Sequence, residues 1–281
     1  MLDLTIVIPV KNEADSLGDC LDSIGTDFAS QVVVVDSGST DASCQIANDW
    51  GAEVVGFVWD GKFPKKRNWY LREHTPATKW VLFLDADEHL TPAFKSELSQ
   101  TLPSTSHVGF WLHYTIYFLG RELKHGYPLD KLALFQVGAG EYERIEEDGW
   151  SHLDMEIHEH PILDGTLGTI RSKIDHRDFR PLHHYIAKHN EYSSWEAARF
   201  LVRSEEDRAS MTWKQKLKYR MVTSPLAGPV YFVGAYLFLR GFLDGSRGFV
   251  FALLKMSYFT QVYCKIREAR QAAGPDSHGD V

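Results

Sequence analysis

The feature that most limits the fold of this chain is the alternation of short apolar runs with helical patterns over about its first 90 residues. Four runs read as buried strands: Leu4–Ile8, Gln31–Val35, Glu53–Val58 and Trp80–Leu84. Helical segments separate these strands, as in right-handed crossovers between parallel strands. The pattern therefore predicts an α/β fold around a mainly parallel sheet. In such sheets ligands bind beyond the carboxyl ends of the strands.

The later sequence predicts a more mixed arrangement. Extended segments are expected at Val108–Phe118, Lys131–Phe135 and Leu167–Ile174, and a helix at residues 182–204. We expect one large domain over residues 1–205, a basic and apolar helical segment over 206–271, and a disordered tail over 272–281.

Composition limits the functional classes. The formal net charge is −8, which argues against a general nucleic-acid binder. The three cysteines are odd in number and far apart, so they favour a reducing compartment over a disulfide framework. The N-terminus shows no secretory signal, and a cytoplasmic location is expected.

The C-terminal third leaves three interpretations open. Two apolar segments, Leu226–Leu243 and Phe249–Cys264, follow a basic cluster over residues 214–220, and each carries a charge. They could be a helical pair packed on the domain, interfacial helices lying in a membrane surface, or a hairpin of two short spans. The basic cluster would draw interfacial helices to anionic lipid.

Two carboxylates, Asp85 and Asp87, directly follow the predicted strand Trp80–Leu84. If the backbone stays extended, residues two apart project to the same side. Paired carboxylates there, followed by Glu88, suit Mg²⁺ or Mn²⁺ shared with a substrate diphosphate.

Two further segments fall near the same sheet edge. Asp36–Asp41 follows the second strand, where the Asp36 carboxylate could bind a base or ribose and Gly38 allows close approach of the backbone. Within it, Ser39-Thr40-Asp41 predicts the N-cap of the next helix. A basic stretch over residues 62–72 could hold phosphates, or be a solvated loop. Neither the glycine-rich dinucleotide motif nor the P-loop motif is present.

Four motifs together resemble the family 2 glycosyltransferases, which have a GT-A fold. They are Val7–Glu13, Val35–Asp41, the Arg67-Asn68 pair and Leu84–Glu88, in that order and at the family's spacing. Residues 107–200 are more loosely similar to the bacterial members that build lipopolysaccharide core or exopolysaccharide. Gly120-Arg121 and His125–Tyr127 fall where the family has an acceptor loop.

The resemblance implies a role for each matching position. Four residues would surround the nucleoside, usually uridine: Pro9, Asn12, Glu13 and Asp36. Arg67 and Asn68 would lie near the base or diphosphate, with Lys66 or Arg67 stabilising the leaving group. Asp85 would face the ribose, and Asp87 would bind the metal with His176, which could equally be a structural histidine.

The catalytic base is the least constrained residue. The family's acidic motif matches best at Ile157-His158-Glu159, and a carboxylate there could take the proton of an acceptor hydroxyl. Glu156 is a competing candidate, and His158 with His160 could instead be zinc ligands.

These observations predict inverting, metal-dependent transfer of a sugar from a nucleotide-diphospho-sugar to a saccharide or lipid-linked acceptor. The protein is expected at the cytoplasmic face of the inner membrane. A nucleotidyltransferase that makes a nucleotide-sugar and a non-catalytic sugar-nucleotide sensor remain alternatives.

Overall fold

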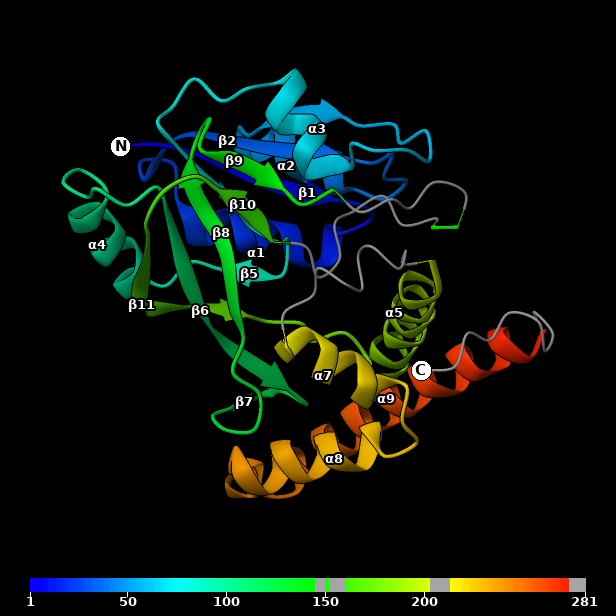
Figure 1. Cartoon of the computed structure of the whole chain (residues 1–281). Helices are drawn as coiled ribbons and strands as arrows, with labels where there is room; N and C mark the ends of the chain where they lie inside the picture. The colour runs from blue at the N-terminus through cyan, green and yellow to red at the C-terminus, as the bar shows by residue number, and fades with distance from the viewer. Residues whose placement is uncertain (145–149, 152–159, 203–212, 273–281) are drawn as a thin grey trace. The chain divides into compact units, whose positions relative to one another are not determined.

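The computed structural model describes residues 1–144, 150–151, 160–202 and 213–272 (Figure 1). The chain forms two compact units. The first comprises Met1–Tyr117 and Pro128–Asp178, and the second comprises Phe118–Tyr127 and Phe179–Val281. The predicted three-part division of the chain stays a prediction.

The first unit is built on one mixed sheet with the strand order β3-β2-β1-β4-β8-β6-β11-β5. Neighbouring strands from β3 to β4 are parallel, as are β6 and β11, whereas β8 is antiparallel to both of its neighbours. The strands are β1 (Leu2–Val10), β2 (Ala29–Asp36), β3 (Glu53–Gly56), β4 (Trp80–Phe83), β5 (Glu88–His89), β6 (Gly109–Phe118), β8 (Asp130–Gln136) and β11 (Leu167–His176). A separate ribbon pairs β9 (Gly140–Tyr142) with β10 (Pro161–Leu163). The predicted α/β class, with its mixed and mainly parallel sheet, is confirmed.

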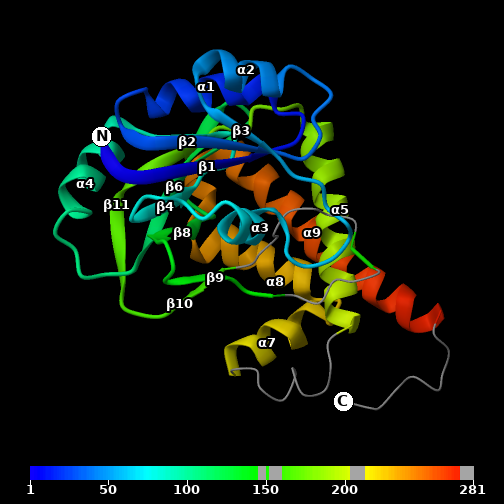
Figure 2. The ribbon, with the colours of Figure 1, turned by 90° about the horizontal axis from the view of Figure 1, so that it is seen from above.

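Both faces of the sheet are covered, which explains the continuous apolar runs of its strands. Side chains such as Val7, Val33 and Val81 form a core with Tyr70 of helix α3 (Lys66–Glu73). The alternate residues of the same strands are also fully buried. On the opposite side of the sheet from α3 lie α1 (Ala14–Ile24) and α2 (Ser43–Trp50), as Figure 2 shows. Helix α4 (Pro92–Thr101) packs beside β11.

The predicted N-cap of α2 is wrong. The helix begins at Ser43, and its N-cap residue is Ala42, which has no capping side chain. Asp41 instead accepts hydrogen bonds from the Ser43 N–H at 3.0 Å and from the Ala14 N–H at 3.0 Å. The carboxylate is therefore used to join the starts of α1 and α2, and the helix begins two residues further on.

The second unit is helical apart from the short strand β7 (Arg121–Leu123). Its elements are α5 (Leu182–Val202), α7 (Trp213–Val222), α8 (Ala227–Val233), a π-helix (Gly234–Phe238), a 3₁₀-helix (Gly241–Asp244) and α9 (Gly245–Ala272). Phe200 of α5, Val222 of α7 and Val262 of α9 share one core. Among the helices that are described, none has the length and apolarity needed to cross a lipid bilayer.

Candidate active site

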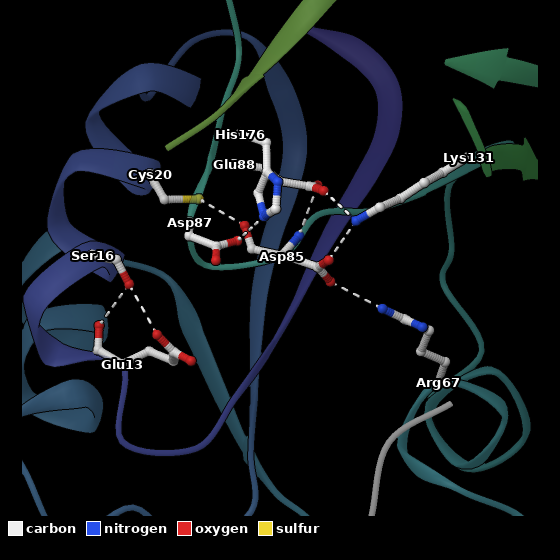
Figure 3. Close-up of polar contacts among 9 residues, drawn as sticks. All are labelled: Glu13, Ser16, Cys20, Arg67, Asp85, Asp87, Glu88, Lys131 and His176. Carbon is white, nitrogen blue, oxygen red and sulfur yellow. Dashed lines mark hydrogen bonds and ion pairs between the residues drawn. The ribbon is translucent and has the colours of Figure 1, made fainter. Parts of the chain in front are cut away.

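The segment Asp85–Asp87 is a turn. Strand β4 ends at Phe83, and the Glu88 N–H donates to the Asp85 carbonyl at 2.9 Å. The Asp85 N–H in return donates to Glu88 Oε2 at 3.0 Å. The expectation of an extended backbone with both carboxylates on one side is therefore wrong. The two side chains point to different partners, as Figure 3 shows.

Asp85 binds two permanent cations. Its Oδ1 lies 2.9 Å from Arg67 Nη2, and its Oδ2 lies 2.6 Å from Lys131 Nζ. Burial raises the pKa of Asp85, but the charges of Lys131 and Arg67 outweigh burial, and the net pKa lies well below its usual value. Asp85 is therefore ionised at any physiological pH.

Lys131, at the start of β8, is a residue of this site that the sequence reasoning missed. Its ammonium group also bonds Glu88 Oε1, and it lies 5.1 Å from the ring centroid of Tyr114. Burial lowers the pKa of Lys131, but Asp85 and Glu88 raise it well above the usual value. Glu88 is 1% exposed, and burial raises the pKa of its carboxyl despite the opposing effect of Lys131. A charged residue opening an apolar strand was the available signal for Lys131.

Asp87 faces His176, whose Nε2 lies 3.3 Å from Asp87 Oδ1. The antiparallel pairing of β11 with β5 places His176 opposite Glu88, and the Arg177 N–H donates to the Asp87 carbonyl at 2.8 Å. Burial lowers the pKa of His176, but the Asp87 carboxylate raises it more strongly. A carboxylate oxygen suits both Mn²⁺ and Mg²⁺, whereas an imidazole nitrogen is the ligand of transition metals, so the pair fits Mn²⁺ better than Mg²⁺. Within the described residues, no three His, Cys, Asp or Glu side chains gather into a complete metal site.

The ends of β1 and β2 are tied together by side chains predicted to surround the nucleoside. Asp36 accepts hydrogen bonds from the Gly38 and Ser39 N–H groups at 3.0 and 3.1 Å. Burial raises the pKa of Asp36, but hydrogen bonds from the side chain and N–H of Ser39, from the Cys44 side chain and from the Gly38 N–H outweigh burial and lower the pKa. Asn12, with φ of 56°, accepts from the Thr40 N–H at 2.8 Å.

Two more of the predicted nucleoside residues lie beside this connection. Pro9 is buried in β1 in register with Val35. The Glu13 N–H donates to Ser43 Oγ at 2.9 Å. The two strand ends thus present a compact rim of polar groups.

The three predicted residues of α3 have different surroundings. Arg67 reaches Asp85, whereas Lys66 is 3% exposed and donates to the Val10 carbonyl at 3.1 Å. Asn68 is fully buried, and its amide bonds the carbonyl and the N–H of Tyr142, both at 2.9 Å. Asn68 therefore fixes the backbone of β9 and has no surface open to a nucleotide.

The predicted base lies outside the described residues. Glu159, its competitor Glu156 and the histidine His158 all fall there, so the assignment of the base stays a prediction. His160 is described and exposed, with its ring centroid 5.9 Å from that of Trp111.

Similar proteins match either nearly the whole chain or little more than a third of it. A lipopolysaccharide core biosynthesis glycosyltransferase, LpsC, of Rhizobium meliloti (strain 1021) is 26% identical over 275 residues, covering 90% of each chain. An uncharacterized glycosyltransferase of Rickettsia typhi is 24% identical over 259 residues, covering 90% of this chain and 83% of that one. An uncharacterized glycosyltransferase of Rickettsia felis is 32% identical over 104 residues, which are 37% of this chain and 35% of the relative.

A solved structure of glucosyl-3-phosphoglycerate synthase from Mycobacterium tuberculosis, with Mn²⁺, UDP and glucosyl-3-phosphoglycerate, is 24% identical. It covers 41% of this chain and 44% of the other, with a TM-score of 0.33. Because this structural similarity is only partial, we infer nothing from it about the substrates of this chain.

The model of the family described as "Glycosyl transferase family 2" matches residues 5–149. That match takes in Asp36, Arg67, Asp85, Asp87 and Lys131, and it covers more than half of the chain. Sugar transfer from a nucleotide-sugar donor to an acceptor is the activity that the family implies, and the mixed sheet is that of its GT-A fold. The chain belongs to glycosyl transferase family 2 and is a glycosyltransferase.

Proposed function

We propose that this glycosyltransferase takes its sugar from a UDP-sugar and transfers it with inversion at the anomeric carbon, with a divalent metal ion bound at Asp87. One observation carries the proposal. Asp87, whose Oδ1 lies 3.3 Å from His176 Nε2, is on the same turn as the Asp85 carboxylate with its two cations. This arrangement supports a metal ion at Asp87 and a diphosphate beside it, at the carboxyl end of β4.

The donor atoms of the pair fit the proposed metal. Asp87 and His176 would hold a Mn²⁺ or Mg²⁺ ion, which would supply Lewis-acid stabilisation of the departing diphosphate. Two protein ligands would leave the remaining positions on the metal to phosphate oxygens and water, as is usual when a nucleotide shares the metal. The imidazole must be neutral to bind a metal.

The other predicted site residues would bind the donor or support the elements that bind it. Arg67 adds positive charge on the side of the turn where Asp85 lies. Asp36 and Asn12 shape the rim at the ends of β1 and β2, where the nucleoside would bind. Lys66 and Asn68 support α3 and β9 from within.

We propose Glu159 as the base, with Glu156 as the competitor. The carboxylate takes the proton of an acceptor hydroxyl while the hydroxyl oxygen forms a bond to the anomeric carbon. The bond from that carbon to the diphosphate breaks on the opposite face, and UDP leaves with the electron pair. One displacement inverts the anomeric centre.

The acceptor we propose is a saccharide of the bacterial cell surface, such as a lipid-linked glycan or lipopolysaccharide core. The name of the Rhizobium meliloti relative, which is similar over nearly the whole chain, supports this class. Such an acceptor is held at the membrane, so we place the enzyme at the cytoplasmic face of the inner membrane.

The test is release of UDP from a panel of UDP-sugars with an extracted core oligosaccharide as acceptor, with Mn²⁺, with Mg²⁺ and with EDTA. We expect metal-dependent UDP release and a product of inverted anomeric configuration by NMR. Asp87→Asn should abolish the metal dependence, and Arg72→Gln, on the exposed end of α3, is the control. Release of pyrophosphate from a nucleoside triphosphate, with no UDP from any UDP-sugar, would overturn the proposal.

A further inference from the structure

Large apolar side chains gather on the surface of one segment of the second unit, residues 226–249, which we name the apolar tip. Nine of them are exposed, and Phe238 is the most exposed at 80%. They are Leu226, Val230, Val233, Leu237, Phe238, Leu239, Phe242, Leu243 and Phe249. Monomeric soluble proteins rarely leave large apolar patches in water, and nine exposed large apolar side chains within 24 residues are an unusual concentration.

The helix of the apolar tip exposes its large apolar side chains and buries its small residues, which is the opposite of a helix on a water-facing surface. The exposed residues Leu226, Val230, Val233 and Leu237 follow one another at intervals of four, three and four, which is one stripe of a helix. The opposite side is buried with small residues. A Cβ on Gly228 would lie 2.4 Å from Thr260 Oγ1 of α9. Small residues thus pack inward and large apolar residues point outward, whereas a water-facing helix keeps its apolar stripe inside.

Charge is segregated in the same part of the chain. Residues 213–272 contain ten Lys or Arg and only two acidic residues, although the whole chain has 30 Lys or Arg against 38 Asp or Glu. The one acidic residue of the apolar tip, Asp244, is covered by His125. It accepts a hydrogen bond from the His125 N–H at 2.8 Å, and its side chain is 9% exposed. The apolar tip therefore belongs to a positively charged region of a negatively charged protein.

We propose that the apolar tip is a docking surface for an anionic lipid bilayer, into which it inserts to the boundary of headgroups and acyl chains. Anionic lipid supplies both an apolar layer for the exposed side chains and a negative surface for the cations. Arg240 is exposed beside Leu239, and its guanidinium would bind phosphate at headgroup depth. The proposal deepens the membrane location given under the proposed function, and the surface itself does not depend on the donor chemistry.

The apolar tip also contacts the segment His125–Tyr127, which falls where the family has an acceptor loop. The Gly126 N–H donates to the Leu239 carbonyl at 2.9 Å. Gly126 has φ of +79°, and a Cβ on it would lie 3.0 Å from the Cα of Gly241. Insertion of the tip would therefore fix this loop at the lipid surface, where a lipid-linked acceptor presents its sugars.

The test is co-sedimentation of the full chain with vesicles of phosphatidylcholine containing 30 mol% phosphatidylglycerol, compared with pure phosphatidylcholine. We expect binding to the anionic vesicles that weakens at high salt. The double variant Phe238→Ser/Phe242→Ser should lower the partition coefficient at least about tenfold, since burying one large apolar side chain changes it by about one to two decades. Ile162→Ser, which changes a 70% exposed side chain of the first unit, is the matched control.

The double variant and the Ile162→Ser control change only exposed side chains, so we expect thermal unfolding to show that both variants fold. Equal partitioning of wild type and double variant would overturn the proposal, and so would wild type that binds neither kind of vesicle. A dimer in light scattering that the double variant dissociates, without vesicle binding, would assign the apolar tip to a second copy instead. Vesicle binding needs no sugar, whereas UDP release tests the proposed function, so the two can fail separately.

Discussion

Replacing Lys131 with methionine tests the charge arrangement of the Asp85 turn. The substitution keeps the apolar stem and removes the ammonium group that lies 2.6 Å from Asp85 Oδ2 and also bonds Glu88. Asp85 retains Arg67, but Glu88, at 1% exposure, loses its only cation among the described ion pairs. We therefore expect a loss of stability that comes mainly from Glu88.

The magnitude follows from burial and from the groups that remain. Breaking a fully buried ion pair costs about 3–5 kcal/mol. Lys131 is 31% exposed, and Glu88 keeps the Asp85 N–H and can take up a proton, so we expect about 2 kcal/mol. For a unit of this size that corresponds to a melting temperature about 4–8 °C lower.

The pH dependence gives the sharper test. Burial raises the pKa of Glu88 in the folded state, and removing Lys131 raises it further. A carboxyl with a raised folded pKa leaves stability intact below its unfolded pKa and loses it as pH rises through the folded pKa. The deficit of Lys131→Met relative to wild type should therefore be small near pH 5 and largest near pH 8.

Urea unfolding followed by tryptophan fluorescence at both pH values measures this difference. Glu88→Gln added to Lys131→Met should restore most of the lost stability, because the uncompensated charge is gone. Lys131→Arg, which keeps the charge, is the control. A deficit of the same size at pH 5 and pH 8, or no rescue by Glu88→Gln, would refute the reasoning.

Three further predictions concern the metal pair and its support. Asp87→Asn should lower metal-dependent UDP release by at least about 100-fold, measured with saturating Mn²⁺, because a direct ligand is lost. The raised pKa of His176 means that protons compete with the metal for the imidazole. The Kd for Mn²⁺ in the presence of UDP, measured by calorimetry, should therefore be larger at pH 6 than at pH 8. His176→Asn should remove most of that dependence, and a dependence that persists would contradict the assignment. Asn68→Ala should cost about 2–4 kcal/mol in urea unfolding, because it removes both hydrogen bonds that the buried Asn68 amide makes to the Tyr142 backbone.

Much of the sheet could be predicted because its signals are local. The runs around Leu4–Ile8 and Gln31–Val35 are largely apolar on both faces, which is typical of strands in a covered, mainly parallel sheet. The extended segments at Val108–Phe118 and Leu167–Ile174 also correspond to strands β6 and β11. The cap of α2 could not be read in the same way, because Asp41 has an alternative acceptor role between two helices.

The candidate site could be predicted less completely, because part of it depends on pairing between distant strands. Lys131 reaches Asp85 only because β8 lies antiparallel to β4, with Phe135 opposite Val81. His176 reaches Asp87 through the pairing of β11 with β5. Neither register follows from local periodicity, so composition and spacing alone could not place these side chains. The family motif pointed to His176, whereas the signal for Lys131 was only a charged residue at the start of an apolar strand.

The turn at Asp85–Asp87 explains why two acids separated by one residue can have different electrostatic roles. In an extended segment both carboxylates would share one set of cations. The turn instead gives Asp85 the permanent charges of Arg67 and Lys131, and it gives Asp87 an imidazole (Figure 3). A lysine or arginine held against Asp87 would have to be displaced before a divalent ion could bind. An imidazole needs only to lose its proton, after which its nitrogen becomes a second ligand. The turn thus separates a carboxylate whose charge is permanently balanced from one whose cationic neighbour can itself become part of a metal site.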